Sequence, residues 1–196
     1  MEKINFIKTF IPQGDFREKY EHGGMMVRHL AAVLDEKMGA YECYECTVPI
    51  GEYDEGEIQK AFVEFSAKMD ALKLKQAKAD KIAEISAYDT SSSVNGFMLN
   101  GLLVWLDKAT RVGLMNSTTI AKAAGQQTTT LWLGGIKLLV DCDKAIQLLS
   151  ALEMYALECF NVTASHKAAV SELTTIEEVE TYDYKAGYPK MLEMSV

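Results

Sequence analysis

The amino-acid sequence predicts an α+β fold in which short β-hairpins alternate with long α-helices and two modules are joined by a long helix. Two turn pairs, Asn100 with Gly101 and Gly134 with Gly135, supply the positive φ angles that two-residue hairpin turns need. Long segments rich in helix-forming residues follow aspartates that can cap a helix. The 196 residues, of which 48% are hydrophobic, are enough for one large domain or two small ones.

Residues 1–54 are expected to form a small β-containing attachment module. The segment INFIKTFIP, residues 4–12, has the composition of a strand, and EHGG, residues 21–24, has that of a turn. Residues 26–34 and 41–48 are predicted to be the arms of a hairpin whose loop contains a glycine. A proline and a glycine then end the second arm and close the module.

Residues 55–88 are predicted to form one long helix that connects the two modules or serves in oligomerisation. Asp54 and Glu57 have the spacing of a capping box, and the segment after them is rich in Ala, Lys, Glu and Leu. A helix of about 34 residues is about 50 Å long, which is more than a small domain needs.

Four apolar residues of this helix follow the 3–4 spacing of a coiled-coil seam: Phe62, Phe65, Met69 and Leu72. Two interpretations are open. The stripe packs on its own domain and the helix continues as a solvated connector, or the stripe is the seam through which copies of the chain associate. The seam has no continuation beyond Gln76.

Residues 89–196 are predicted to form a hairpin–helix–hairpin–helix C-terminal domain. The segment DTSSSVNG, residues 89–96, breaks the long helix and marks the boundary. Asp107 follows the first hairpin, and Asp141 or Asp143 follows the second, each where a helix cap belongs.

A short last helix is predicted near the end of the chain. Thr174 and Glu177 have capping-box spacing, which places the start of this helix there. An aromatic tail with Tyr182, Tyr184 and Tyr188 follows it.

Composition argues against nucleic-acid and membrane partners. The net charge is −8, and a lysine-rich stretch at residues 68–81 has no aromatic residues interleaved, which is typical of a solvated helix face. No apolar run reaches the roughly 20 residues of a membrane span or forms the core of a signal peptide. We therefore expect a soluble protein made in a reducing cytoplasm.

No residue pattern indicates catalysis, a metal or a cofactor. Cys43 and Cys46 form a C-x-x-C pair, but residues three apart in a strand point to opposite faces. Cys159 and His166 would lie about 10.5 Å apart along one helix, too far for a nucleophile and its base. We expect no catalytic, metal-binding or cofactor-binding residues, and no enzyme.

Between about residues 78 and 173, four segments follow one another: YDTSSSVNGFMLNG, DKATRVGLMNSTTIAKA, TTLWLGG and ALEMYALECFNVTASHKAAVSEL. This succession resembles a domain of unknown function that recurs in tail-fibre and tail-fibre-associated proteins of tailed bacteriophages. The resemblance brings no catalytic signature and transfers no binding residues. It implies a non-enzymatic structural or accessory protein of a phage or prophage tail, at the tail fibre or tail tip.

Such a protein is expected in the virion tail, after synthesis in the cytoplasm of the bacterial host. Its expected partners are copies of itself and other phage tail proteins, and a trimer is the preferred oligomer because tail fibres commonly resemble trimers. A weaker alternative is a tail-fibre assembly factor that is absent from the virion.

A second alternative is a module that binds host-surface glycans or another small ligand, with Trp105, Trp132 or the terminal tyrosines as contacts. Both tryptophans are predicted to be core residues, because each has apolar neighbours on both sides and a tryptophan is a strong core anchor. A ligand platform would instead need an exposed ring beside polar groups.

Overall fold

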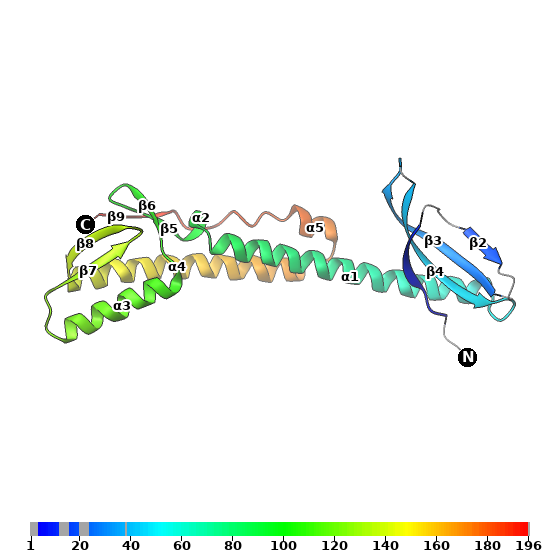
Figure 1. Ribbon diagram of the computed structural model, residues 1–196, viewed down its shortest axis with the longest axis horizontal. Helices are drawn as coiled ribbons and strands as arrows, with labels where there is room; N and C mark the ends of the chain where they lie inside the picture. The colour runs from blue at the N-terminus through cyan, green and yellow to red at the C-terminus, as the bar shows by residue number, and fades with distance from the viewer. Residues whose placement is uncertain (1–3, 12–15, 20–23, 38, 196) are drawn as a thin grey trace. The chain divides into compact units, whose positions relative to one another are not determined.

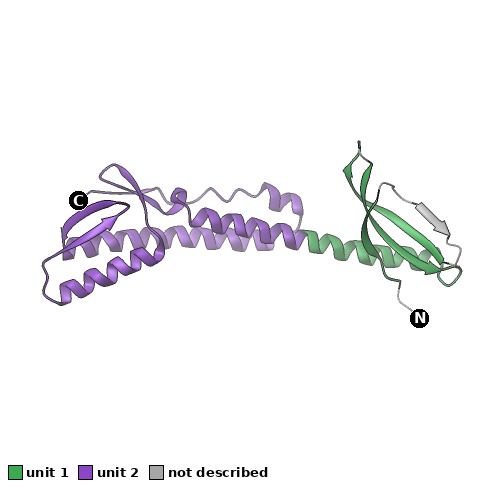
Figure 2. Ribbon diagram, viewed as in Figure 1, with its two compact units in different colours: residues 1–73 green, residues 74–196 purple. Residues whose placement is uncertain are grey.

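The computed structural model describes residues 4–11, 16–19, 24–37 and 39–195 and confirms the α+β class (Figure 1). The chain divides into two compact units, residues 1–73 and residues 74–196 (Figure 2). The predicted limits at residues 54 and 88 coincide with the ends of helix α1 (Glu55–Asp89), whereas the two units divide within this helix.

Unit 1 contains a four-stranded antiparallel sheet with strand order β1-β4-β3-β2. Its strands are β1 (Ile7–Ile11), β2 (Phe16–Lys19), β3 (Gly24–Asp35) and β4 (Ala40–Pro49). The predicted hairpin is confirmed, because β3 and β4 pair over most of their length. The turn predicted at residues 21–24 lies outside the described residues, except for Gly24.

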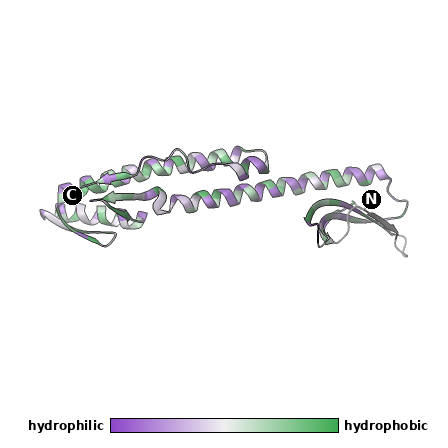
Figure 3. Ribbon diagram, turned by 90° about the horizontal axis from the view of Figure 1, so that it is seen from above, coloured by the Kyte–Doolittle hydropathy of each residue, from purple (hydrophilic) through white to green (hydrophobic). Residues whose placement is uncertain are grey.

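One face of this sheet packs on the first half of α1. The shared core is formed by Phe6, Val27, Tyr44, Cys46, Val48 and Ile58. The predicted capping box starts the helix: the Glu57 amide donates to Asp54 Oδ1 at 2.8 Å, and the Asp54 amide donates to Glu57 Oε2 at 3.0 Å. Hydrophilic and hydrophobic residues alternate at short intervals along α1 (Figure 3).

Unit 2 contains the second half of α1 and all the elements that follow it. These are α2 (Ser92–Asn95), β5 (Gly96–Leu99), β6 (Leu102–Trp105), α3 (Lys108–Ala123), β7 (Thr128–Leu133), β8 (Ile136–Asp141), α4 (Cys142–Glu172), α5 (Ile176–Thr181) and β9 (Leu192–Met194).

Both predicted hairpins of unit 2 are confirmed. Asn100 and Gly101 turn between β5 and β6 with φ angles of 50° and 81°. Gly134 and Gly135 turn between β7 and β8 with φ angles of 57° and 87°. The second hairpin packs on the first, because a Cβ built on Gly134 would lie 2.9 Å from Val104 Cγ1.

The two caps that begin α3 and α4 also agree with the sequence prediction. Asp107 accepts from the Thr110 amide, and Asp141 accepts from the amides of Asp143 and Lys144. Helix α3 runs antiparallel to α4, since Arg111 near its start pairs with Glu153 and Lys122 near its end pairs with Asp143 at the start of α4.

Two apolar clusters hold unit 2 together. The larger joins the hairpins to α4 and contains, among others, Phe97, Leu99, Leu131, Leu133, Leu149 and Leu152. The smaller joins α1, α4 and α5 through Ile85, Val170 and Val179. Among the described residues, no helix combines the length and the apolar character that crossing a membrane requires.

Candidate ligand-binding site

The two tryptophans are exposed, and the prediction that they belong to the core is wrong. Trp105 is 41% exposed and Trp132 is 57% exposed. Successive strand residues point to opposite faces, so Leu131 and Leu133 are buried on the face opposite Trp132. The prediction treated neighbours in sequence as neighbours on one face, although they show only that the other face is buried.

Trp105 lines a pocket of about 730 Å³ in unit 2, here called the Trp105 pocket. Its apolar lining includes Trp105 at the end of β6 and Leu157 and Phe160 on α4. Leu157 is 49% exposed and Phe160 is 58% exposed. Three large apolar side chains from two elements therefore face solvent at one hollow, and pockets of this size commonly hold small molecules.

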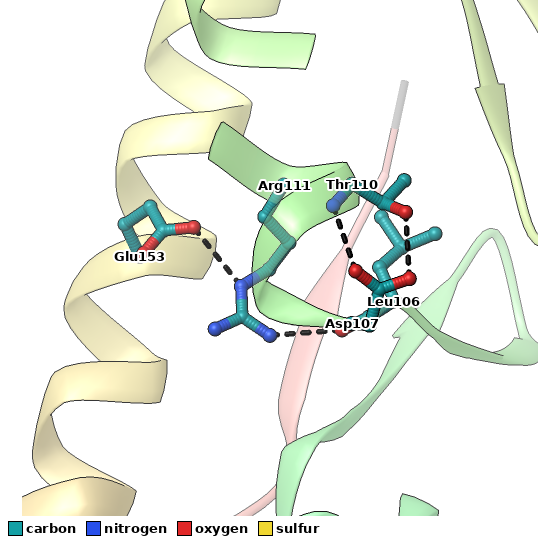
Figure 4. A network of polar contacts seen from close by, with 5 residues as sticks. All are labelled: Leu106, Asp107, Thr110, Arg111 and Glu153. Atoms are coloured by element: carbon teal, nitrogen blue, oxygen red, sulfur yellow. Dashed lines mark hydrogen bonds and ion pairs between the residues drawn. The ribbon is translucent and has the colours of Figure 1, made fainter. Parts of the chain in front are cut away.

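The polar lining is organised by Arg111, which is only 8% exposed (Figure 4). Its Nε donates to Glu153 Oε1 at 2.9 Å, and its Nη1 donates to the Leu106 carbonyl oxygen at 2.8 Å. The other terminal nitrogen makes no hydrogen bond to any residue that the structure describes and lies on the side of α4 (Figure 4). The guanidinium is thus held in place while one donor stays available.

Asp107 fixes the start of α3 beside this arginine (Figure 4). Its Oδ1 accepts from the Thr110 amide at 2.8 Å, and its Oδ2 accepts from the Thr110 hydroxyl at 2.7 Å. These hydrogen bonds from Thr110 lower the pKa of Asp107. The carboxylate thus caps the N-terminus of α3 beside the pocket.

Asp89, the last residue of α1, and Asn95, the last residue of α2, form another part of the pocket wall. Asp89 Oδ1 accepts from the buried Thr163 hydroxyl at 2.8 Å, and that hydroxyl also lies 2.9 Å from the Tyr188 hydroxyl. The Asn95 side-chain amide donates to the Asp89 carbonyl oxygen. The wall thus rests on hydrogen bonds to α4 and to the C-terminal segment.

Cys46 and Cys159 are buried thiols. Burial raises the pKa of Cys46 to about 11, and burial also raises the pKa of Cys159. Cys159 Sγ lies 3.5 Å from the Val94 carbonyl oxygen, whereas His166 contacts Tyr182 and the Ala186 carbonyl oxygen. The structure thus gives Cys159 and His166 separate partners.

The four residues predicted for self-association have two different environments. Phe62, Phe65 and Met69 are partly buried against the sheet of their own chain, and Phe62 stacks on His29 with ring centroids 3.9 Å apart. Leu72 is 49% exposed. The interpretation that the stripe packs on its own domain therefore holds for Phe62, Phe65 and Met69, and association of copies through this seam stays a prediction.

A second hollow, of about 840 Å³, lies in unit 1. Its helical wall carries Glu57, Lys60, Glu64 and Lys68, which is typical of a solvated helix face. It contains no tryptophan. In the described part of the chain, no three His, Cys, Asp or Glu residues gather in a way that could hold a metal ion.

Sequence reasoning did not find the pocket residues Arg111, Glu153, Leu157 and Phe160. The available signal was a pair of large apolar residues at 157 and 160 on a helix face that also carries Glu153. That face meets Arg111 only through tertiary packing of α3 on α4.

Fold and pocket together define a class: a two-unit α+β protein whose second unit carries a pocket of ligand-binding size. The chain belongs to the family described as "Domain of unknown function (DUF4376)", which matches residues 76–186 and so more than half of the chain. The resemblance of residues 78–173 to a domain of unknown function is thereby confirmed. No curated protein and no solved structure matches this chain.

Proposed function

We propose that the chain is a non-enzymatic structural or accessory protein of a bacteriophage or prophage tail, associated with the tail fibre or tail tip. The resemblance of its C-terminal half to a domain of tail-fibre proteins supports this role. The protein would work by contact with copies of itself and with other tail proteins. It would reside in the virion tail after synthesis in the host cytoplasm.

The proposal of self-association rests on the outer face of the β7–β8 hairpin. Trp132 and Thr130 lie on this face of β7, opposite Lys137 and Leu139 of β8. Leu139 is 75% exposed and Trp132 is 57% exposed. An apolar face that its own chain leaves uncovered is typical of a protein contact. We assign this face to a second copy of the chain, with a trimer as the preferred assembly.

Light scattering on the purified full-length protein tests this assignment. Leu139→Glu should shift the protein from oligomer to monomer, because it places a charge in the contact. Leu72→Glu is the matched control and places the same charge on an exposed leucine of the α1 seam. If copies meet at the hairpin face, this variant leaves the oligomer unchanged. A wild-type monomer at tens of micromolar, or an oligomer broken only by Leu72→Glu, would contradict the assignment.

Unit 1 is proposed as the module that attaches to other tail proteins. Its strand β1 lies at the edge of the sheet and presents Ile7 and Phe10, which are 57% and 66% exposed. An edge strand with apolar side chains can accept a strand from a partner.

The location in the particle is tested by protein mass spectrometry of purified virions. A tail component should copurify with the particles in constant proportion to known tail proteins. If the protein is abundant in infected cells and missing from virions, the role of an assembly factor takes the place of the structural role.

A second candidate function is the binding of a host-surface glycan or another small ligand by the Trp105 pocket. The observation that favours it is the exposed indole of Trp105 beside the polar side chains of Arg111 and Glu153. Glycan-array binding that is lost in a folded Trp105→Ala variant would support it, and an array without signal would count against it.

A further inference from the structure

We infer that the Trp105 pocket binds a neutral, polyhydroxylated ligand of the carbohydrate class. This inference rests on the ligand-binding role proposed for the pocket and names the chemistry of the ligand. A sugar ring offers C–H groups on its faces and hydroxyl groups around its rim. A fitting site therefore combines exposed aromatic surface with hydrogen-bonding groups beside it, and the pocket has both.

The aromatic part is formed by Trp105 and Phe160, and Leu157 belongs to the same lining. Trp105 and Phe160 are 41% and 58% exposed, so both rings have surface that no other part of their own unit covers. Trp105 stands on β6 and Phe160 on α4, so the two rings are held by separate rigid elements. Such rings lose little conformational freedom when a ligand covers them.

The hydrogen-bonding part is the Arg111–Glu153 pair. Two of the three guanidinium nitrogens already donate, to Glu153 Oε1 and to the Leu106 carbonyl oxygen, and one remains available (Figure 4). Glu153 keeps its second oxygen as an acceptor, and its side chain is 34% exposed. A hydroxyl group both donates and accepts, so two neighbouring hydroxyls of a sugar can satisfy this fixed donor and acceptor together.

The charges of the lining favour a neutral ligand over an anionic one. Asp89, Asp107 and Glu153 carry three carboxylates, and Lys108 and Arg111 carry two cationic groups. Arg111 is already paired with Glu153. A phosphate or a sialic acid would therefore be repelled by the carboxylates of Asp89 and Asp107 and attracted mainly by the ammonium group of Lys108. The whole chain, with a net charge of −8, adds to this repulsion.

The polar pair also argues against an apolar peptide as the occupant. A side chain such as leucine would cover the open nitrogen of Arg111 and the second oxygen of Glu153 without giving either a partner. Buried polar groups without partners oppose binding.

The chain has two tryptophans, and this makes the pocket directly observable. In a full-length Trp132→Phe variant, Trp105 is the sole indole. We expect its fluorescence to change with saturation when neutral disaccharides of glucose, galactose, mannose or N-acetylglucosamine are added at millimolar concentrations. At least one of these sugars should produce the change, and N-acetylneuraminic acid and glucose 6-phosphate should produce none.

Matched variants separate the pocket from the rest of the surface. Trp105→Ala should weaken binding of the sugar by about tenfold or more, measured by ligand-observed NMR, and Trp132→Ala should leave it unchanged, although Trp132 is also exposed. Glu153→Gln should weaken binding by about threefold to tenfold, and because it also removes the charge that pairs with the buried Arg111, binding is measured well below its unfolding midpoint. If Trp105→Ala does not fold, Phe160→Ser replaces it, because Phe160 is 58% exposed.

The outcomes are distinct. Binding of anionic probes alone, or of an apolar peptide at Trp105 without any sugar, would overturn the carbohydrate class and leave a ligand-binding role in place. Binding of no probe, or loss of binding in Trp132→Ala, would overturn both. The self-association test at Leu139 is independent of all of these results.

Discussion

A buried carboxylate ties three elements of unit 1 together, and its removal should destabilise that unit. Glu42 on β4 is 5% exposed. Its Oε2 lies 2.7 Å from Lys8 Nζ on β1, and its Oε1 lies 3.1 Å from Lys73 Nζ on α1. Glu42→Gln keeps the shape of the side chain and removes the charge that both lysines neutralise.

The magnitude follows from the exposure of the three side chains. Breaking a fully buried ion pair costs about 3–5 kcal/mol, and breaking an exposed pair costs about 0–1 kcal/mol. The carboxylate of Glu42 is buried, but the side chains of Lys8 and Lys73 are 32% and 37% exposed and can turn to water after the change. We therefore expect Glu42→Gln to lower the free energy of unfolding by about 1–3 kcal/mol.

The effect should also depend on pH. Burial by itself would raise the pKa of Glu42, but the hydrogen bonds and charges of Lys8 and Lys73 outweigh burial and lower the pKa below its ordinary value of 4.5. A carboxyl group with a lowered pKa contributes stability above its ordinary pKa and loses it as the pH falls through the folded-state pKa. The difference between wild type and Glu42→Gln should be complete at neutral pH and should shrink as the pH falls below about 4.5.

Urea unfolding followed by far-UV circular dichroism measures the difference, and amide hydrogen exchange on β3 and β4 assigns it to unit 1. Tryptophan fluorescence alone is not suitable, because Trp105 and Trp132 both belong to unit 2. Glu64→Gln, at an exposed position of α1, is the control and should change stability by less than about 0.5 kcal/mol. A Glu42→Gln variant as stable as wild type at neutral pH, or a difference that persists unchanged to pH 3, would refute the role of the ion pairs.

Two further predictions concern unit 2. Tyr155→Phe should lower the free energy of unfolding by about 1–3 kcal/mol in urea titrations followed by tryptophan fluorescence, because the buried Tyr155 hydroxyl donates to the Val94 carbonyl oxygen at 2.7 Å. An unchanged midpoint would show that this hydrogen bond is replaceable. Gly134→Ala should lower the melting temperature more than Gly135→Ala: both glycines have positive φ, but only at Gly134 would the added Cβ meet Val104, at 2.9 Å. Equal effects of the two substitutions would contradict the packing of this turn on β6.

Local chemistry was enough to predict most elements of the fold. The glycine-containing turns and the aspartate caps act through their own backbone neighbourhood, so their effect can be read from a few residues. The last helix shows the limit of such signals. The sequence predicted a cap at Thr174 with Glu177, whereas Thr175 and Glu178 form the capping box. Two adjacent pairs have the same spacing, so spacing alone does not distinguish them.

Contacts between distant segments were not predictable in this way. Strand β9 has three residues and pairs in parallel with β5, almost a hundred positions earlier in the chain. A strand of this length has no pattern of its own, and its pairing depends on where the C-terminal segment runs. The Trp105 pocket has the same origin, because β6, α3 and α4 each supply residues to it.

The sequence left two interpretations of the helix stripe open and predicted the strand tryptophans wrongly, for the same physical reason. Periodicity shows which residues share a face, but tertiary packing decides whether that face is covered. In α1, Phe62 and Phe65 share a face that the sheet of unit 1 covers. In β7, Trp132 shares its face with Thr130. The hairpin register adds Lys137 beside it, with Nζ 6.0 Å from the centroid of the Trp132 ring. Trp132 and Leu139 stay exposed on this face, so the indole is available to a partner even though the opposite face of the same strand forms the core.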